Sequence, residues 1–441
     1  MIGYGKHYLL YRLFYVYRQP TGEARGEGGI VNIETLALHA GYAPDPSTGA
    51  TVAPIHQTTA YAYATAEEIA AVFAGRAPGF IYSRIANPTA AALERRLAEL
   101  EAGVGCLSCA SGMAAIATTA LGLTRTGDHV IAARGIFGGT VSFFAKTLAR
   151  FGVRTTFVDA GSVDAFRAAI EPATRFVFVE TITNPRMEVP DLPALAAVTR
   201  AAGIPLVVDS TVTTPMLLRP KEWGADLVVH SLSKFINGHG NAIGGAIVDT
   251  GNFDWRRGPF EDIGALARRA GKLAFLAHLR TLIYRDLGCC PSPLNSFLHL
   301  TGIEGLPLRM EAHCRNAQAL AEWLSAHPKV DWVNYPGLPD NPCHEVAGRL
   351  FGGRYGGLLT FGLGSAAAAA RFVDATRLAR NLANLGDSRT LVIHPASTIF
   401  QEFSPDERAA AGVPDDLVRV SVGVENIEDI VHDFETALAG V

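Results

Sequence analysis

Residues 205–234 read PLVVDSTVTTPMLLRPKEWGADLVVHSLSK, and they give the clearest indication of the fold class. It contains two short and almost wholly apolar runs, 205–208 and 226–229, each followed by polar residues. Strands of this kind are typical of parallel sheets whose two faces are covered by crossover helices. The stretch therefore predicts neighbouring strands of a mainly parallel α/β sheet, with polar side chains at the strand ends.

The same alternation of strand, loop and helix extends toward the N-terminus, with further apolar runs at 129–133 and 175–179. A helix is predicted before these runs, with Thr89 as its N-cap and Gly103 at its end. Apolar side chains recur along one face of this helix, as expected where a helix packs on a sheet. Together these elements predict a large sheet domain over residues 85–282.

The composition changes on either side of that domain. Beyond it, a helical stretch precedes strand-like segments at 357–361 and 417–422, which predicts a smaller α+β domain over residues 283–441. Before it, residues 1–84 form an N-terminal extension. The first 30 residues are aromatic, are interrupted by arginine and glycine, and are interpreted as a flexible segment rather than a signal peptide.

The charge balance excludes some classes of partner. The 441-residue chain has 38 Lys and Arg against 42 Asp and Glu, a formal net charge of −4. Without a basic cluster, this balance gives no reason to expect nucleic acid or an anionic membrane as a partner. No apolar run is long enough to span a bilayer, and the composition is that of a soluble globular protein.

The six cysteines are too sparse for a secreted disulfide scaffold, so the reducing cytoplasm is the expected compartment. Cys106 and Cys109 form a C-x-x-C pair, but no second pair stands at the spacing of a zinc site. We interpret them as two small buried residues at the start of a helix rather than as a redox or metal site. No metal site is predicted.

Lys234 stands in the segment VVHSLSKFINGHG, residues 228–240. An enzyme that uses pyridoxal 5'-phosphate (PLP) needs one lysine that forms an imine with the cofactor and then shuttles protons. The hydroxyls of Ser231 and Ser233 can bind a phosphate, since short donors beside a strand end form an anion cradle. A lysine in a polar surface loop is the alternative, and the flanking serines and glycines favour the cofactor.

Asn184, Asp209 and Lys234 follow successive apolar runs at a constant spacing of 25 residues, about one helix–strand unit. Ligands of open α/β sheets bind outside the carboxyl ends of the strands, so these residues are expected in one crevice. A carboxylate such as Asp209 keeps the pyridine nitrogen of PLP protonated, which the cofactor's electron sink requires. Taken alone, Asp209 could equally be a helix cap.

Three further features could complete such a site. Ser111, Gly112 and Met113 open an Ala-rich helix, and exposed N–H groups at a helix N-terminus bind phosphate. Phe137 could stack on the pyridine ring, and Arg419 could clamp a carboxylate with two hydrogen bonds. Individually, each is more often a helix cap, a core aromatic residue or a surface charge.

With these residues assembled, the sequence resembles the Cys/Met-metabolism family of fold-type-I PLP enzymes from about Ile33 onward. The resemblance implies a mainly parallel seven-stranded sheet with a smaller α+β C-terminal domain. It rests on these motifs: YSRIANPT at 82–89, SGM at 111–113, FGGT at 137–140, ETITNP at 180–185, VDSTVTTP at 208–215, SLSK at 231–234 and GHG at 238–240.

The resemblance also implies the cofactor and the roles of the motif residues. Lys234 and Tyr82 would be catalytic, and Asn384 and Arg419 would hold the substrate carboxylate. Tyr82 and Arg84, on the N-terminal arm, would reach the phosphate in a neighbouring subunit, which predicts a homo-oligomer with shared active sites, a dimer paired into a tetramer. The implied PLP-binding set is Tyr82, Arg84, Ser111, Gly112, Met113, Phe137, Asn184, Asp209, Thr211, Ser231, Ser233 and Lys234.

Within the family, five segments are most similar to the O-acetylhomoserine sulfhydrylase subgroup. They are PIHQTTAY at 54–61, GNFDW at 251–255, RDLGCCPSPLNSFL at 285–298, HPKVDWVNYPGL at 327–338 and NLGDSRTLVIHPAST at 384–398. The subgroup implies γ-replacement on O-acetylhomoserine with sulfide, which gives homocysteine in methionine biosynthesis.

Several alternatives stay open. Phe137 replaces the usual tyrosine, and Ile399 and Phe400 replace Thr-His, so an O-succinylhomoserine sulfhydrylase or a cystathionine γ-synthase remains possible. Methionine γ-lyases carry a cysteine where Gly139 stands. A PLP-binding protein without catalysis is a remote alternative. A nicotinamide dehydrogenase is poorer still, because no G-x-G-x-x-G follows an early strand.

Overall fold

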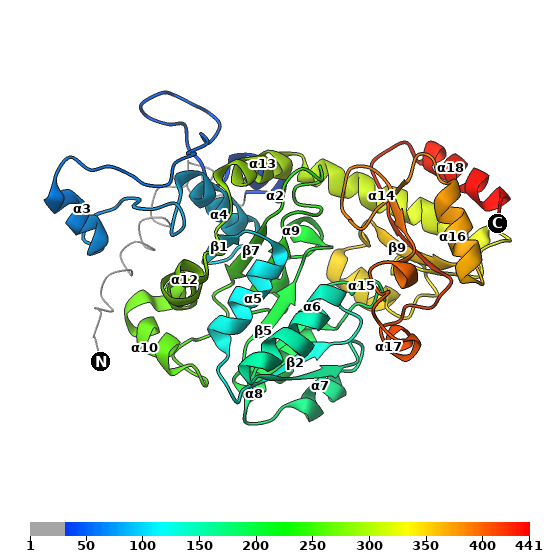
Figure 1. Ribbon diagram of the computed structural model, residues 1–441, viewed down its shortest axis with the longest axis horizontal. Coiled ribbons are helices and arrows are strands. Elements are labelled where there is room, and N and C mark those ends of the chain that lie inside the picture. Colours follow the sequence, from blue (N-terminus) through cyan, green and yellow to red (C-terminus); the bar gives the residue numbers. More distant parts are fainter. Residues whose placement is uncertain (1–30) are drawn as a thin grey trace.

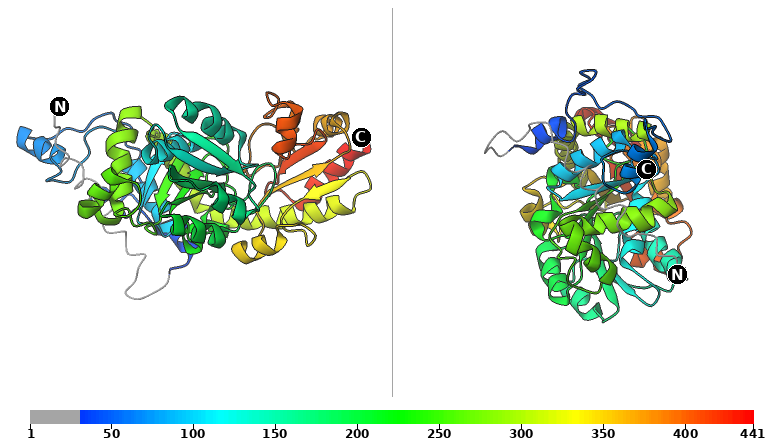
Figure 2. Two further views of the ribbon diagram at one scale, coloured as in Figure 1. Left: turned by 90° about the horizontal axis from the view of Figure 1, so that it is seen from below. Right: turned by 90° about the vertical axis from the view of Figure 1, so that its left-hand side faces the viewer.

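The computed structural model describes residues 31–441 and contains two sheets side by side, each covered by helices (Figure 1). The flexible segment expected over residues 1–30 lies outside the described residues. The segment with helix α3 projects away from the large sheet (Figures 1 and 2). None of the helices in the described part of the chain combines the length and apolarity that a bilayer crossing needs.

The first sheet has seven strands in the order β1-β7-β6-β5-β4-β2-β3. Strand β7 runs antiparallel to both of its neighbours, and the other strand pairs are parallel. The predicted α/β class with a mainly parallel seven-stranded sheet is confirmed. The strands are β1 (Gly105–Cys109), β2 (His129–Ala133), β3 (Arg154–Val158), β4 (Thr174–Glu180), β5 (Leu206–Asp209), β6 (Leu227–Ser231) and β7 (Gly245–Asp249).

Four of these strands, β2, β4, β5 and β6, coincide with the predicted apolar runs, whereas β1, β3 and β7 were missed. Strand β3 lies at the sheet edge and alternates exposed with half-buried residues, so it lacks a continuous apolar run. The prediction for Cys106 and Cys109 was wrong in one respect, because both lie within β1 rather than at a helix start. Both are buried, as expected, and burial raises the pKa of each thiol well above its usual value.

Helix α4 (Pro88–Leu100) is capped by Asn87, not by Thr89 as predicted. The Asn87 side chain accepts a 2.9 Å hydrogen bond from the Thr89 N–H, and Pro88 occupies the first turn, where it needs no hydrogen-bond partner. The Thr89 hydroxyl instead donates to the Pro54 carbonyl over 2.7 Å. The helix also ends earlier than predicted, at Leu100 rather than Gly103.

The first sheet region contains further helices, most of which cover its two faces or connect its strands (Figures 1 and 2). They are α2 (Ile33–His39), α3 (Ala66–Phe73), α5 (Gly112–Leu123), α6 (Gly138–Ser142), α7 (Val163–Ala169), α8 (Leu192–Ala202), α9 (Thr214–Leu217), α10 (Glu261–Ala270), α11 (Ala274–His278), α12 (Arg285–Leu287) and α13 (Pro293–Glu304). Short 3-10 or π segments are η1 (Phe143–Thr147), η2 (Leu148–Phe151), η3 (Pro220–Trp223), η4 (Gly271–Leu273) and η5 (Leu279–Tyr284).

The second sheet has five strands in the order β10-β11-β12-β9-β8, with helices packed on it, as expected for a smaller α+β region. Its strands are β8 (Trp332–Asn334), β9 (Leu358–Gly362), β10 (Arg380–Asn381), β11 (Leu391–Ile393) and β12 (Leu417–Ser421). Its helices are α14 (Leu306–Ala326), α15 (His344–Phe351), α16 (Ala366–Ala375), α17 (Pro405–Ala410), α18 (Ile427–Ala439) and the 3-10 turn η6 (Pro395–Ser397).

Helix α14 joins the two regions, because its side chains belong to both hydrophobic cores. Leu306 and Met310 pack in the core of the first sheet, and Leu320 and Leu324 pack in the core of the second. A domain boundary placed between the two regions would therefore divide a helix that packs in both hydrophobic cores. The domain limits 1–84, 85–282 and 283–441 stay predictions.

Candidate active site

A cavity of about 950 Å³ lies at the carboxyl ends of β4, β5 and β6, where the sequence predicted a crevice. Residues of the second sheet region close its other side. All of the predicted site residues except Tyr82 and Arg84 line it. They are Ser111, Gly112, Met113, Phe137, Asn184, Asp209, Thr211, Ser231, Ser233, Lys234, Asn384 and Arg419.

Lys234 projects its amine into this cavity. Its Nζ donates a 2.5 Å hydrogen bond to the side-chain oxygen of Asn384, 150 residues further along the chain. Burial, together with the positive charge of Arg419, lowers the pKa of the Lys234 amine to about 8. Because only a neutral amine can attack a carbonyl, this lowered pKa suits a lysine that forms an imine.

Asp209 is a half-buried carboxyl group held in one orientation by Thr211. The N–H and the hydroxyl of Thr211 both donate to Oδ1 of Asp209, over 2.9 and 2.5 Å. The same hydroxyl accepts the N–H of Ser231 over 2.8 Å, so Thr211 also connects Asp209 with β6. Burial raises the pKa of Asp209 despite these bonds, which makes a cationic partner, such as a protonated pyridine nitrogen, favourable beside it.

Glu180 is a pocket residue that the sequence reasoning missed. It ends β4 opposite Asp209, and its two carboxylate oxygens accept the N–H groups of Phe137 over 2.8 Å and Asn184 over 3.2 Å. Burial and the charge of Asp209 raise its pKa well above the usual value. One signal was present in the sequence, since Glu180 ends its strand just as Asp209 ends the next.

The N-terminus of α5 and the end of β6 form a small cradle at one end of the cavity. Ser111 is the N-cap of α5 and accepts the N–H of Ala114 over 3.0 Å. The N–H groups of Gly112 and Met113, in the first turn, have no acceptor within the helix and are available to an anion. A Cβ atom on Gly112 would lie 2.7 Å from Cβ of Ser231, so only glycine allows this approach.

Two other predicted residues, Ser233 and Phe137, also line the cavity. The Ser233 hydroxyl accepts the N–H of Gly244 over 3.0 Å and donates weakly to its carbonyl over 3.3 Å. Phe137 precedes α6, and its side chain is 43% exposed on the cavity wall. Its ring therefore has an open face on which a planar group could stack.

Arg419 is 4% exposed and reaches the cavity from β12. Its guanidinium donates to Oδ1 of Asn184 over 3.2 Å and to the carbonyl of Asn384 over 3.0 Å. Burial lowers its pKa to about 10, so it remains a cation at neutral pH. Within residues 31–441 its Nε has no hydrogen-bond partner, and a buried orphan donor of this kind suits a carboxylate ligand.

Tyr82 and Arg84 lie outside the cavity of their own chain. Tyr82 is 42% exposed, and the Arg84 guanidinium lies 5.5 Å from the centroid of its ring. Arg84 also donates to the carbonyl of Arg285. That these two residues reach the cofactor phosphate in a neighbouring subunit stays a prediction.

The cavity fits PLP on three independent observations. A half-buried amine with a lowered pKa and a half-buried carboxyl group line the same cavity, a glycine-lined helix N-terminus supplies free N–H groups, and an aromatic ring borders the space. These groups match, in turn, the aldehyde, the pyridine nitrogen, the phosphate and the ring of the cofactor. Lys234, Asp209, Gly112, Ser231 and Phe137 would hold it.

Comparisons with known proteins agree with this fit. The Cys/Met metabolism PLP-dependent enzyme family matches residues 34–439. The chain is 44% identical to O-acetyl-L-homoserine sulfhydrylase 1 of Thermus thermophilus, over 93% of this chain and 100% of that protein. It is 41% identical to homocysteine synthase of Schizosaccharomyces pombe, over 92% of this chain and 98% of that one.

A solved structure gives the same result. A Campylobacter jejuni protein assigned as an O-acetylhomoserine (thiol)-lyase, solved with N'-pyridoxyl-lysine-5'-monophosphate, superimposes with a TM-score of 0.85. The two sequences are 34% identical, and the match covers 92% of this chain and all of that one. The chain described here belongs to the Cys/Met metabolism PLP-dependent enzyme family.

Proposed function

We propose that this protein catalyses γ-replacement on O-acetylhomoserine with sulfide. The Cγ–O bond of the substrate breaks, a Cγ–S bond forms, and the products are homocysteine and acetate. The observation that carries the proposal is the presence in one cavity of Lys234 and of Arg419, whose Nε–H has no partner within residues 31–441, both hydrogen-bonded to Asn384. Relatives that are about 40% identical over nearly the whole chain bear the names of this activity.

In the proposed reaction, the polar residues of the cavity have separate roles. Arg419 and Asn384 hold the α-carboxylate, and Asp209 keeps the pyridine nitrogen of the cofactor protonated. Bound PLP supplies the electron sink that stabilises negative charge at Cα. Lys234 takes the proton from Cα once the substrate amine has replaced it, and Tyr82 of a neighbouring subunit assists the later proton transfers.

The charges of the cavity favour acetyl over succinyl and sulfide over cysteine. Among its described lining residues, the cations are Lys234 and Arg419, and both already have a role. A succinyl group, or cysteine as second substrate, brings another carboxylate, which would enter near Glu180 and Asp209 without a cation to pair with. The rest of the wall is largely apolar, with Ile116, Ile182, Val212, Ile243 and Ile399.

Gly139 argues against a methionine γ-lyase, whose cysteine stands at this position. A Cβ atom there would lie 2.6 Å from Cε1 of Phe137, so any side chain would force the ring to move. The space that a cysteine would need is filled by an aromatic ring on the cavity wall. This observation favours replacement over elimination.

The experiment is a substrate panel on the PLP-loaded enzyme. O-acetylhomoserine with sulfide is expected to give homocysteine, at least about tenfold faster than O-succinylhomoserine, because an unpaired carboxylate costs more than 1.4 kcal/mol. Cystathionine from cysteine, without homocysteine from sulfide, would make it a cystathionine γ-synthase. Ammonia and 2-oxobutanoate from methionine would make it a lyase. PLP binding without any turnover would reject catalysis altogether.

The proposed enzyme is a homo-oligomer with shared sites, a dimer paired into a tetramer, in the cytoplasm. The support is that Tyr82 and Arg84 lie outside their own cavity, on a segment with exposed Val52, Ile55 and Phe73.

Sedimentation is expected to show dimers or tetramers. In a 1:1 mixture of the two inactive variants Lys234→Ala and Arg84→Ala, activity should return to about a quarter of the wild-type value, because half of the dimers are mixed and each mixed dimer keeps one of its two sites intact. No regain would contradict shared sites.

A further inference from the structure

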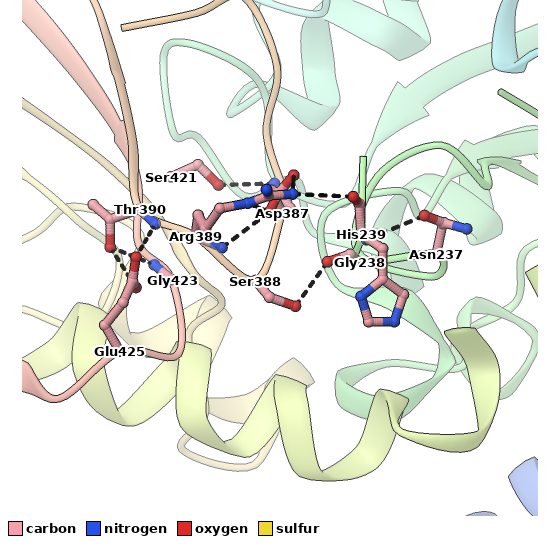
Figure 3. Close-up of polar contacts among 11 residues, drawn as sticks. Asn237, Gly238, His239, Asp387, Ser388, Arg389, Thr390, Ser421, Gly423 and Glu425 are labelled. Carbon is pink, nitrogen blue, oxygen red and sulfur yellow. Dashed lines mark hydrogen bonds and ion pairs between the residues drawn. The ribbon is translucent and has the colours of Figure 1, made fainter. Parts of the chain in front are cut away.

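The loop 386–390 lies between the two chain segments that leave the active site (Figure 3). On one side is the turn that follows Lys234. The carbonyl of Gly238 accepts both the N–H and the hydroxyl of Ser388, over 2.8 and 2.7 Å. Arg389 donates to the carbonyl of His239 over 3.1 Å.

On its other side, the same loop is bound to the segment that follows β12, the strand of Arg419 (Figure 3). The N–H of Gly386 donates to the Ser421 hydroxyl over 2.8 Å. The N–H and the hydroxyl of Thr390 donate to the two carboxylate oxygens of Glu425, over 2.6 and 2.9 Å. The loop therefore forms a latch, defined as residues 386–390 with their partners in 238–239 and 421–425.

The latch is braced from within by Asp387, which is only 6% exposed. Its Oδ1 accepts the N–H and Nε–H of Arg389 over 3.0 and 2.8 Å, and its Oδ2 accepts Nη2–H over 3.1 Å. A Cβ atom on Gly240, where φ is +64°, would lie 2.5 Å from Oδ2 of Asp387. The turn that follows Lys234 and the loop 386–390 therefore approach each other as closely as the missing side chain of Gly240 allows.

Each end of the latch is a few residues from a group that binds the substrate in the proposed reaction. Gly238 donates its N–H to the carbonyl of Lys234 over 2.8 Å. Asn384 stands two residues before Gly386, and Arg419 stands two residues before Ser421. An amino acid carries its amine and carboxylate on one carbon, so the groups that bind them must keep a fixed spacing.

We propose that the latch sets this spacing and that Ser388, Asp387 and Arg389 are positioning residues for the α-carboxylate. They touch neither the substrate nor the cofactor and act through Lys234, Asn384 and Arg419. The inference rests on the proposed function only in taking an amino acid as substrate. It predicts that loosening the latch weakens recognition of the carboxylate and leaves recognition of the amine unchanged.

The test compares two ligands on the PLP-loaded enzyme, L-2-aminobutyrate and n-propylamine, which differ only in the carboxylate. The change in cofactor absorbance on titration gives a Kd for each. In Arg389→Ala the Kd of L-2-aminobutyrate is expected to rise about tenfold or more, and in Ser388→Ala about fivefold, with the Kd of propylamine unchanged. Arg371→Ala, an exposed arginine on α16, is the matched control and should change neither value.

Two results would overturn the proposal. One is wild-type affinity for L-2-aminobutyrate in both latch variants, and the other is an equal loss for both ligands, which would point to a disturbed cofactor site. Ser388→Ala removes one hydroxyl only, so it remains a test if Arg389→Ala folds poorly. Neither ligand is turned over as an acyl-homoserine would be, so failure of the proposed reaction would leave this result unaffected.

Discussion

Glu180 and Asp209 lie opposite each other in the register of β4 and β5, so a buried and a half-buried carboxyl group share one edge of the active site. Burial raises the pKa of both, and the pKa of Glu180 is raised well above its usual value by burial and by the charge of Asp209. Since adjacent like charges disfavour each other, a cation beside Asp209, such as the protonated pyridine nitrogen of bound PLP, would relieve the repulsion between the two carboxylates.

Replacing Glu180 by alanine should lower kcat/KM for O-acetylhomoserine about 10- to 100-fold, because the buried N–H groups of Phe137 and Asn184 lose their acceptors. Glu180→Gln keeps one acceptor oxygen and should fall between the alanine variant and wild type. Steady-state kinetics measures both. A wild-type kcat/KM in Glu180→Ala would show that the two loops need no anchor.

Replacing Asp209 by asparagine should lower kcat about a hundredfold or more, because the pyridine nitrogen loses the charge that keeps it protonated. Asp226→Asn is the matched control, since Asp226 is a buried carboxyl group outside the cavity, at the residue before β6, where it accepts the N–H of Leu206. That variant should keep wild-type kcat at saturating PLP. Equal kcat losses in the two variants would contradict a specific role for Asp209.

The rate at which PLP forms its covalent link with the apoenzyme should rise with pH through about 8 and level off above it. The lowered pKa of Lys234 has this sign, because the neutral, reactive amine accumulates as pH rises through that value. Stopped-flow absorbance at a series of pH values measures the rate. A midpoint near 10.5, the ordinary lysine value, would contradict the lowered pKa, and Lys234→Ala should form no covalent link at any pH.

Replacing Arg419 by lysine should raise KM for the amino-acid substrate about 10- to 100-fold, with a smaller change in kcat. A lysine keeps the charge but cannot bond a carboxylate with two parallel N–H groups while also holding the Asn384 carbonyl. Initial-rate kinetics separates the two parameters. Arg371→Lys, at an exposed position, should leave KM unchanged. A wild-type KM in Arg419→Lys would show that the substrate carboxylate binds elsewhere.

Asp226 should make the stability of the protein depend on pH. Burial raises its pKa from 3.8 to about 7, so the folded chain keeps a proton that the unfolded chain has lost. Its contribution to stability therefore falls as pH rises from about 4 to about 7. The difference in Tm between Asp226→Asn and wild type should shift in favour of the variant across that window. A constant difference would contradict the raised pKa.

The central strands and the polar groups at their ends could be predicted from local stretches of the chain. Buried parallel strands must be apolar on both faces, so β4, β5 and β6 are visible as runs, and Asn184, Asp209 and Lys234 follow from their spacing. Ser111 was identifiable as an N-cap for a similarly local reason, because a helix start needs an acceptor within a few residues. Each of these features depends on residues that are neighbours in the chain.

The remaining features depend on contacts between residues that are distant in the chain. Glu180 acquires its role from Phe137, 43 residues away, the latch joins residues 150 apart, and Arg419 meets Asn184 across 235 residues. Asn87 displaced Thr89 as a helix cap because the Thr89 hydroxyl is bound to Pro54. Propensity and periodicity describe local preferences, whereas these contacts exist only after packing has brought distant segments together, so no local pattern encodes them.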